Sequence, residues 1–446
     1  MATKWIGCFL ACSALSIAAC DEDRAGRAPP GAGAPGSRGW DDQISDNASS
    51  LIEKGRQIFR HDTFGSEQFW GGQLRLHDAI KGEARGGVGP GLTARQALQV
   101  GLRIDVGRLG RDLIEAIERG SVNLDDVGTT LTLLGAGAVV GVEGVFDGGN
   151  LVGVGLTCSF CHATVDDSLA AGIGRRRDGW PNRDLDIGKI VSLAPDLSWF
   201  QQVLGVPRAA VVAVLLSWGP GKYDAQLTLD GKAFRPDGKP AATVIPAAYG
   251  LAGQNLHTYT GFGSVPYWNA YVANTQMHGQ GTFFDRRLAD PAKFPLASRT
   301  GVANKRDPID NITSKLEALH LYQLAIPPPK PDRRSFDPAA ARAGEAIFMG
   351  KAKCGTCHVP PLFSEPGWPM HTAAEIGIDD FQARRSPDGM YRTTPLRGLF
   401  ARAKPGFYHD GRFPDLDAVV DHYEPVLGFH LELAEQRNLI EYLKSL

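Results

Sequence analysis

The sequence has no spare cysteines. Three of its seven cysteines, Cys8, Cys12 and Cys20, lie within the first twenty residues, and the other four form two closely spaced pairs. No cysteine is left over for a structural disulfide, so the chain is not a disulfide-stabilised scaffold of the kind common among small secreted domains. Each of the two pairs therefore needs a local chemical explanation.

A strong net charge is also missing. The formal net charge is −2 over 446 residues, so no long-range field attracts nucleic acid, and we expect no nucleic-acid partner. Residues 127–142 are apolar but are interrupted by glycines that weaken a helix, so a buried segment beside the first cysteine pair is expected there. Glycine (54) and proline (29) are abundant, which favours loop-rich domains, two or three at this length.

Two copies of the pattern C-x-x-C-H contain the four paired cysteines. The pattern is the attachment signal for c-type haem. Two thiols bond to the two vinyl groups on one edge of the porphyrin, and the histidine that follows is held under the iron as its proximal ligand. We therefore expect two covalently bound haem c groups. The residues are Cys158, Cys161 and His162 for the first haem, and Cys354, Cys357 and His358 for the second.

A zinc site and a thiol-redox pair are the alternative interpretations of a C-x-x-C pattern. A zinc site needs further soft ligands at close spacing. A redox pair has no need of the histidine that follows. Neither alternative explains why the complete five-residue pattern occurs twice.

The N-terminus has the features of an export signal. Lys4 precedes an apolar run, Trp5–Ala19, that is shorter than the ~20 residues of a membrane-spanning helix. Ala18-Ala19-Cys20 resembles the lipobox of bacterial lipoproteins, which implies removal of residues 1–19 and a lipid anchor on Cys20. An ordinary signal peptide is the alternative. In both cases we expect an exported protein, in the periplasm or at the outer face of a bacterial membrane.

Composition and a short repeat divide the rest of the chain. Residues 20–50 have the composition of a disordered tether. Gly55–Phe59 is echoed by Gly344–Phe348, which stands just before Cys354, whereas about a hundred residues separate the first copy from Cys158. We therefore expect an N-terminal haem domain at 51–325 that contains an insertion. A proline-rich linker at 326–334 and a C-terminal cytochrome c domain at 335–446 follow.

The expected fold is mainly α-helical with long loops, in two cytochrome c-like haem domains of which the first is enlarged. Periodicity predicts helices at 51–59, 95–100, 109–119, 316–324 and 433–446. Asp337-Pro338 predicts a helix start, with aspartate as the N-cap and proline at the first helical position. The aromatic, loop-rich residues 235–281 look like the wall of a cofactor pocket.

The C-terminal third resembles a known family. Tyr391–Gly398 (YRTTPLRG) and Gly406–Gly411 (GFYHDG) are similar to the "P-x-L-R-N" and "PYFHDG" patterns that follow the second haem motif in the di-haem cytochrome c peroxidases. Their relatives that oxidise tryptophans in a partner protein share these patterns. Gly398 replaces the asparagine here, and Gly406-Phe407 replaces Pro-Tyr. The large insertion also resembles the di-haem rubber oxygenases, although no matching motif supports that comparison.

This resemblance implies a sixth ligand for the second haem. In the family it lies about fourteen residues after the histidine of "HDG", as methionine in the peroxidases and as tyrosine in the tryptophan-oxidising relatives. Counted from His409, the position is Tyr423. A packed tyrosine without this role is the alternative. Four other residues are rival ligands: Met370, His371, Met390 and His422.

The sequence does not decide which residue, if any, binds the iron of the first haem on the side opposite His162. His61, His257, Met277 and His278 are candidate ligands, and an open coordination site is the other possibility. Glu143, Glu375 and His371 are candidates for moving a proton of peroxide. Four arginines after the first motif are candidates for pairing with haem propionates, unless they form a solvated loop. These arginines are Arg175, Arg176, Arg177 and Arg183.

The resemblance implies an oxidoreductase that reduces hydrogen peroxide with electrons from a small donor protein or cytochrome. The two motifs alone require only an exported di-haem cytochrome that transfers electrons. Oxygenation or oxidation of a large substrate, including a protein, is a third possibility.

Overall fold

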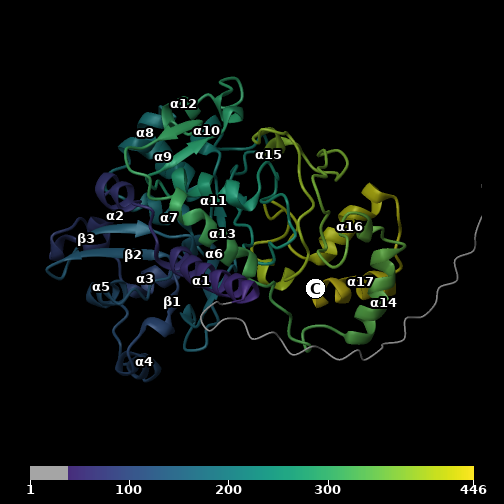
Figure 1. The fold of residues 1–446 in the computed structure, drawn as a ribbon, viewed down its shortest axis with the longest axis horizontal. Helices are drawn as coiled ribbons and strands as arrows, with labels where there is room; N and C mark the ends of the chain where they lie inside the picture. The colour runs from purple at the N-terminus through teal and green to yellow at the C-terminus, as the bar shows by residue number, and fades with distance from the viewer. Residues whose placement is uncertain (1–38) are drawn as a thin grey trace, which may run out of the picture. The chain divides into compact units, whose positions relative to one another are not determined.

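The computed structural model describes residues 39–446, and the predicted signal peptide and Cys20 lie outside them. By its internal contacts the chain divides into residues 1–46 and one unit, 47–446, which contains both C-x-x-C-H motifs. Within the described residues the fold is mostly helical, with long loops and small two-stranded sheets (Figure 1). The domain boundaries given above stay a prediction.

The helices are short, as a chain rich in glycine and proline predicts. They are α1 (Trp40–His61), α2 (Leu76–Lys81), α3 (Ala94–Gln99), α4 (Arg111–Glu118), α5 (Val127–Gly135), α6 (Ser159–His162), α7 (Ile187–Ser192), α8 (Ser198–Leu204), α9 (Arg208–Ser217), α10 (Leu227–Asp230), α11 (Val265–Asn274), α12 (Ala297–Thr300), α13 (Leu316–Ala325), α14 (Pro338–Met349), α15 (Phe381–Arg384), α16 (Leu416–Leu427) and α17 (Leu433–Ser445).

The strands pair two by two, and each pair is only a few residues long. Strand β1 (Ile104–Asp105) runs parallel to β5 (Ile173–Gly174), and the other four pairs are antiparallel. These pairs are β2 (Val142–Asp147) with β3 (Asn150–Leu156), β4 (Ala163–Val165) with β6 (Arg176–Asp178), β7 (Lys222–Tyr223) with β8 (Thr243–Val244), and β9 (Thr282–Phe284) with β10 (Asn304–Arg306).

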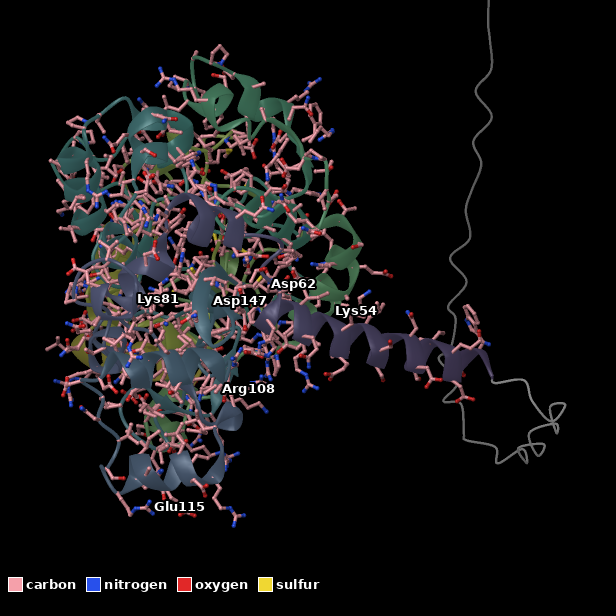
Figure 2. The ribbon with its side chains drawn as sticks, turned by 90° about the vertical axis from the view of Figure 1, so that its left-hand side faces the viewer. Lys54, Asp62, Lys81, Arg108, Glu115 and Asp147 are labelled. Carbon is pink, nitrogen blue, oxygen red and sulfur yellow. The ribbon has the colours of Figure 1, made fainter. Side chains whose placement is uncertain are left out.

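The helices predicted from periodicity are present. The side chain of Asp337 accepts hydrogen bonds from the amides of Ala339 and Ala340 at the start of α14, and proline occupies the first turn, which confirms the predicted cap. Helix α1 begins at Trp40, so residues 40–50 of the predicted tether are helical. Lys54 lies on this helix and Asp62 just after its end (Figure 2).

The repeated sequence Gly-x-x-x-Phe makes the same helix crossing twice. A methyl group on Gly55 of α1 would collide with the backbone oxygen of Ala318 on α13, and one on Gly344 of α14 would collide with that of Asn438 on α17. The accompanying Phe59 and Phe348 are fully buried. Their rings pack against tyrosines, Phe59 on Tyr322 at 5.6 Å and Phe348 on Tyr442 at 5.2 Å between centroids. Only glycine permits either approach.

No single helix among the described residues is long and apolar enough to cross a membrane. Only by their combined length and composition could the two helices α8 and α9 form a membrane span, and they meet at an angle of 91°.

A buried ion cluster joins segments that are far apart in the sequence. The guanidinium of Arg385 donates to Asp224 at 2.9 Å and to both oxygens of Asp230 at 2.8 and 3.0 Å. It also donates to the carbonyl of Ala241 at 3.1 Å. The three charged side chains are at most 1% exposed. The segment after α15 is therefore fastened to the loops around α10.

A second buried feature is the aromatic environment of His278. Its ring stacks on Phe69 at 3.5 Å and 10°, and Trp199 meets it edge-on at 4.8 Å. Burial, with a smaller contribution from the charge of Lys305, lowers the pKa of His278 to about 3. The imidazole is therefore neutral in the folded protein at neutral pH.

Replacing Arg385 by methionine should strongly destabilise the fold, because two buried carboxylates lose their only guanidinium. The expected loss of unfolding free energy is about 3–5 kcal/mol, measured by urea denaturation. Arg384→Ala is the matched control, since this side chain is 74% exposed and pairs only with Asp380. An exposed pair contributes at most about 1 kcal/mol. Similar losses in the two variants would contradict the prediction.

His278 should make the protein less stable in acid. Its folded pKa of about 3 lies below the unfolded value of about 6.5. As the pH falls from about 6.5 towards 3, the unfolded chain therefore binds a proton that the folded chain excludes. This single group should remove up to about 1.4 kcal/mol per pH unit.

The measurement is the unfolding free energy against pH for wild type and His278→Phe, which keeps an aromatic ring in the stack. The variant should lose less stability in acid than the wild type. The same substitution at His430, whose side chain is 78% exposed, is the control. Parallel curves for wild type and His278→Phe would exclude this role.

Candidate functional site

The first motif lines a cavity, which we call the first cavity. Cys158 precedes helix α6, and His162 is its last residue. Gly141, in a left-handed conformation with φ +79°, packs against the backbone of Phe160 between the two cysteines, so residues 127–142 end beside the motif as expected. The cavity has a volume of about 180 Å³ and is also lined by Trp70, Tyr223, Trp268 and Gln276.

The second motif lines another cavity, the second cavity, of about 240 Å³. Cys354–Thr356 form a 3₁₀ turn shortly after α14. Helices α16 and α17 contribute apolar side chains to the wall, including Val420, Leu439 and Leu443. The second cavity thus lies at the crossing of α14 and α17 (Figure 1).

Each motif histidine is held in place by a hydrogen bond of one of its own ring nitrogens. The Nδ1 of His162 lies 3.1 Å from the carbonyl oxygen of Pro246, and the Nδ1 of His358 lies 3.0 Å from that of Phe363. A carbonyl only accepts, so Nδ1 carries the proton and Nε2 keeps a free lone pair. Burial lowers the pKa of both histidines to about 4. Neutral imidazoles with a free Nε2 are suited to bind a metal.

The cysteines lack the lowered pKa that is typical of redox thiols. All four are free. Burial raises the pKa of Cys158, Cys161 and Cys354 to about 12, and it also raises the pKa of Cys357. A redox-active cysteine needs a lowered pKa, because the thiolate is the nucleophile. The thiol-redox interpretation is therefore disfavoured.

Three arginines at the second cavity have no carboxylate partner that would balance their charge. Arg183 donates to the carbonyl of Lys404, Arg392 to those of Thr258 and Leu256, and Arg402 to that of Pro395. The Nε atoms of Arg183 and Arg402 are buried without a partner. Buried positive charge requires an anion. The two propionates of a haem would supply it, so this donor set fits the group.

The remaining predicted propionate partners lie elsewhere. Arg176 pairs with Asp105 at 3.1 Å, and Arg177 covers the ring of Trp180 at 4.6 Å. Arg175 is exposed. Arg183, which follows the first motif in sequence, lines the second cavity. Sequence reasoning did not single out Arg392 and Arg402, because no local pattern separates them from other surface arginines.

Tyr423 on α16 lines the second cavity, as the count from His409 predicts for a ligand there. Tyr408 lines it as well, and its hydroxyl is buried without a partner. Of the rivals, only His371 lines this cavity. His422 bonds to the carbonyl of Ile376 at 2.9 Å. Neither Met370 nor Met390 lines the cavity, so no methionine faces this site.

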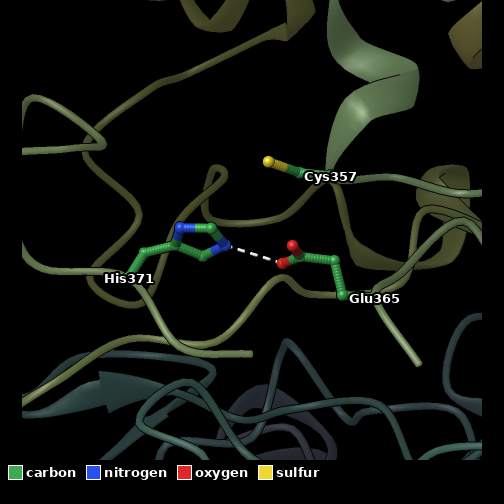
Figure 3. Close-up of side chains that lie close together, drawn as sticks. All are labelled: Cys357, Glu365 and His371. Atoms are coloured by element: carbon green, nitrogen blue, oxygen red, sulfur yellow. Dashed lines mark hydrogen bonds and ion pairs between the residues drawn. The ribbon is translucent and has the colours of Figure 1, made fainter. Parts of the chain in front are cut away.

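His371 belongs to a cluster at the cavity edge. Its Nε2 lies 2.6 Å from a carboxylate oxygen of Glu365, and Cys357 stands beside the pair (Figure 3). The ligand atoms of the three residues lie within 4.8 Å of one another, so they could also hold a metal ion. A metal ion at this cluster would need the sulfur of Cys357 as a ligand, whereas haem attachment would bond the same sulfur to a vinyl group. The metal site and the attached haem therefore exclude each other.

Two candidate ligands remain at the first cavity. His257 and Met277 line it. His257 is 7% exposed and its Nδ1 has no partner, and burial lowers its pKa well below the usual value. His61 bonds to Glu143 at 2.8 Å and His278 lies in the aromatic stack, so neither reaches this cavity.

Neutral polar groups also line the first cavity, and two of them lie in residues 235–281, which the sequence predicts as a pocket wall. Trp268 Nε1, Gln276 Nε2 and Gln382 Oε1 are buried there without partners. Among residues 39–446, no carboxylate lines this cavity. Glu375 lines the second cavity, while Glu143 lines neither. A glutamine or tryptophan carries no sequence signal for such a role, and Gln382 reaches the site only because the chain folds back.

No family model matches the chain. In sequence, the chain is 30% identical over 125 residues to the methylamine utilization protein MauG of Methylorubrum extorquens, covering 24% of this chain. The chain spans about a third (35%) of the length of that relative. This similarity agrees with the resemblance to the di-haem cytochrome c peroxidase superfamily that the C-terminal motifs indicate.

Two solved structures overlap with parts of the chain. One is a MauG-like protein associated with microbial copper homeostasis, at 19% identity and a TM-score of 0.31, covering 48% of this chain and 77% of that one. The other is a hydrazine synthase of Kuenenia stuttgartiensis, at 20% identity and a TM-score of 0.26, covering 48% and 76%. TM-scores this low do not establish a shared fold.

Proposed function

We propose that this protein is an exported di-haem c-type cytochrome with peroxidase-type oxidoreductase activity. The observation that carries the proposal is the duplicated site: two cavities, each lined by a C-x-x-C-H motif whose histidine is held through Nδ1 with Nε2 free. The similarity to MauG supports a redox role. Electrons would come from a small donor protein or cytochrome.

Each haem would be held by residues of one motif and by the cavity around it. The thiols of Cys158 and Cys161, and of Cys354 and Cys357, would form the thioether bonds, with His162 and His358 beneath the iron. The three arginines without carboxylate partners would bind the propionates of the second haem. When bound, haem supplies one-electron redox chemistry and a site for oxygen-derived ligands.

Residues at the first cavity are suited to handle hydrogen peroxide. His257 is neutral at physiological pH, so its ring can accept a proton and return it. Trp268 and the amide of Gln276 offer unpartnered N–H donors that can orient a small oxygen ligand. The first cavity is therefore our proposed site of peroxide chemistry, with His257 in place of Glu143, Glu375 and His371, the three candidates from the sequence.

Tyr259 is placed to connect the two sites. It lines both the first and the second cavity, and its ring lies 6.4 Å from that of His409. Electrons that enter at the second haem would pass this residue on the way to the first.

A second candidate function is oxidation of a large substrate, such as another protein. Tyr423, and no methionine, faces the second cavity, and methionine ligation raises the potential of a haem. A tyrosine ligand would stabilise the oxidised iron and lower the potential of the second haem, as in the tryptophan-oxidising relatives named above and unlike the methionine-ligated peroxidases. The MauG similarity fits this candidate equally well.

Export and membrane attachment are part of the proposal. Cleavage before Cys20 and lipid attachment to it would hold the protein at the outer face of a bacterial membrane, in the periplasm. Covalent haem attachment by the C-x-x-C-H signal suits that compartment.

Peroxide turnover tests the proposed function. The purified ferric protein is first examined by low-temperature electron paramagnetic resonance, which counts high-spin and low-spin irons. Consumption of hydrogen peroxide is then followed with a reduced small cytochrome as donor. We expect turnover, directly or after partial reduction. Two bound haems without turnover would contradict the peroxidase function and leave electron transfer.

Tyr423→Phe should convert the second haem from low-spin to high-spin, because the phenol oxygen is removed while the ring stays. Tyr391→Phe is the matched control: Tyr391 lines the same cavity, but its hydroxyl already donates to the carbonyl of Asp379 at 3.0 Å, so this variant should leave the signal unchanged. Electron paramagnetic resonance of the ferric variants reads out the spin state. An unchanged spectrum for Tyr423→Phe would rule this residue out as the ligand and favour His371.

A further inference from the structure

Helix α11 brings a tyrosine with a built-in proton acceptor next to the first cavity. The hydroxyl of Tyr267 donates to a carboxylate oxygen of Asp285 at 2.7 Å. Tyr267 is half-buried and belongs to the aromatic cluster around Trp268, Tyr271 and Phe283. Nothing in the proposed peroxide chemistry uses this pair.

Trp268 connects this tyrosine to the cavity. It is 6% exposed and lines the first cavity, and its Nε1 has no partner. Its ring centroid lies 5.8 Å from that of Tyr267, at 85°. One aromatic contact therefore separates Tyr267 from a ring that faces the first cavity, and packed aromatic rings are good carriers for single electrons.

The carboxylate beside Tyr267 is ionised. Burial alone would raise the pKa of Asp285, but hydrogen bonds from Arg287 and from Tyr267 lower it. Arg287 donates to both carboxylate oxygens and also lies over the Tyr267 ring, with its guanidinium carbon 5.6 Å from the centroid. A positive charge there disfavours a cationic phenol radical, so oxidation of Tyr267 requires its proton to leave together with the electron.

The neighbouring Tyr271 provides an internal comparison. Its ring lies 5.4 Å from Trp268 and stacks on Tyr267 at 6.1 Å and 7°. It is 1% exposed. Unlike Tyr267, Tyr271 makes no hydrogen bond to a carboxylate within residues 39–446. Of these two tyrosines, Tyr271 lies slightly closer to Trp268, at 5.4 Å against 5.8 Å, but Tyr267 is the one that donates to a carboxylate.

We propose that Tyr267 is a redox-active tyrosine, which gives an electron through Trp268 to the first cavity and its proton to Asp285. This inference rests on the proposed function, because hydrogen peroxide is the oxidant. Reduction of one peroxide to two waters consumes two electrons and two protons. One electron comes from Tyr267 and the other from the second haem, which the small donor has reduced beforehand, and both protons come from solvent. Tyr267 becomes a neutral tyrosyl radical and Asp285 a carboxylic acid.

The arrangement would let the protein keep an oxidising equivalent outside the cavity. A haem bound to Cys158, Cys161 and His162 would occupy the first cavity, which these three residues line, so a bulky reductant would be excluded from it. A radical on the half-buried Tyr267 could take its electron back from a phenolic or other aromatic donor that cannot enter. The proton on Asp285 returns to the phenolate oxygen in the same step.

The test is rapid-freeze electron paramagnetic resonance of the holoprotein, first reduced by one electron per molecule, freed of the reductant and then mixed with hydrogen peroxide. Protein grown with ring-deuterated tyrosine identifies a tyrosyl signal by its narrowing. We expect this signal in the wild type and in Tyr271→Phe, and we expect it to be lost in Tyr267→Phe. Asp285→Asn, which keeps the side-chain shape but cannot accept the proton, should also lose it.

Haem absorption recorded on the same samples separates the possible failures. A response of the haem to peroxide without a tyrosyl signal would overturn this inference alone. Survival of the signal in Tyr267→Phe, or its full yield in Asp285→Asn, would overturn it as well. No response of the haem in the wild type would overturn the proposed peroxidase function and this inference with it.

Discussion

Two hydrogen bonds to backbone carbonyls determine what the candidate sites can do. The Nδ1 atoms of His162 and His358 are committed to Pro246 and Phe363, so each ring can present only Nε2 to its cavity. Such a second bond fixes the tautomer and orientation of a metal-binding histidine. Pro246 lies in a segment without regular secondary structure, and Phe363 lies in a turn. Residues outside helices and strands, which are numerous in this glycine- and proline-rich chain, therefore determine the orientation of the two imidazoles.

Each of the two cavities is lined by residues from both sides of the proline-rich segment 326–334. Arg183 and Tyr259 precede the proline-rich segment 326–334 and line the second cavity, while Gln382 follows that segment and lines the first. The ion cluster of Arg385 with Asp224 and Asp230 fastens the same segments together. A boundary at the proline-rich segment divides the sequence, but each cavity takes part of its wall from the other side of it.

Local patterns were readable from the sequence, and long-range pairings were not. The C-x-x-C-H motifs and the cap at Asp337 are complete within a few residues. Tyr423 was found by its count from His409, which the family resemblance supplied. His61 and His278 could not be separated from His257 in advance, because the choice depends on neighbours such as Glu143 and Phe69 that lie far away in the sequence. The same reason hid Arg392 and Arg402.

The repeated helix crossing makes the distance between two helices independent of the chain between them. Gly55 and Gly344 permit the same close approach, and a phenylalanine four residues later packs on a tyrosine in both. Ten residues connect Gly344 to its motif and about a hundred connect Gly55 to its own. The contact of Gly55 with α13 therefore tolerates a long intervening segment, because the lack of a side chain, and not the length of the connection, decides how closely the two helices meet.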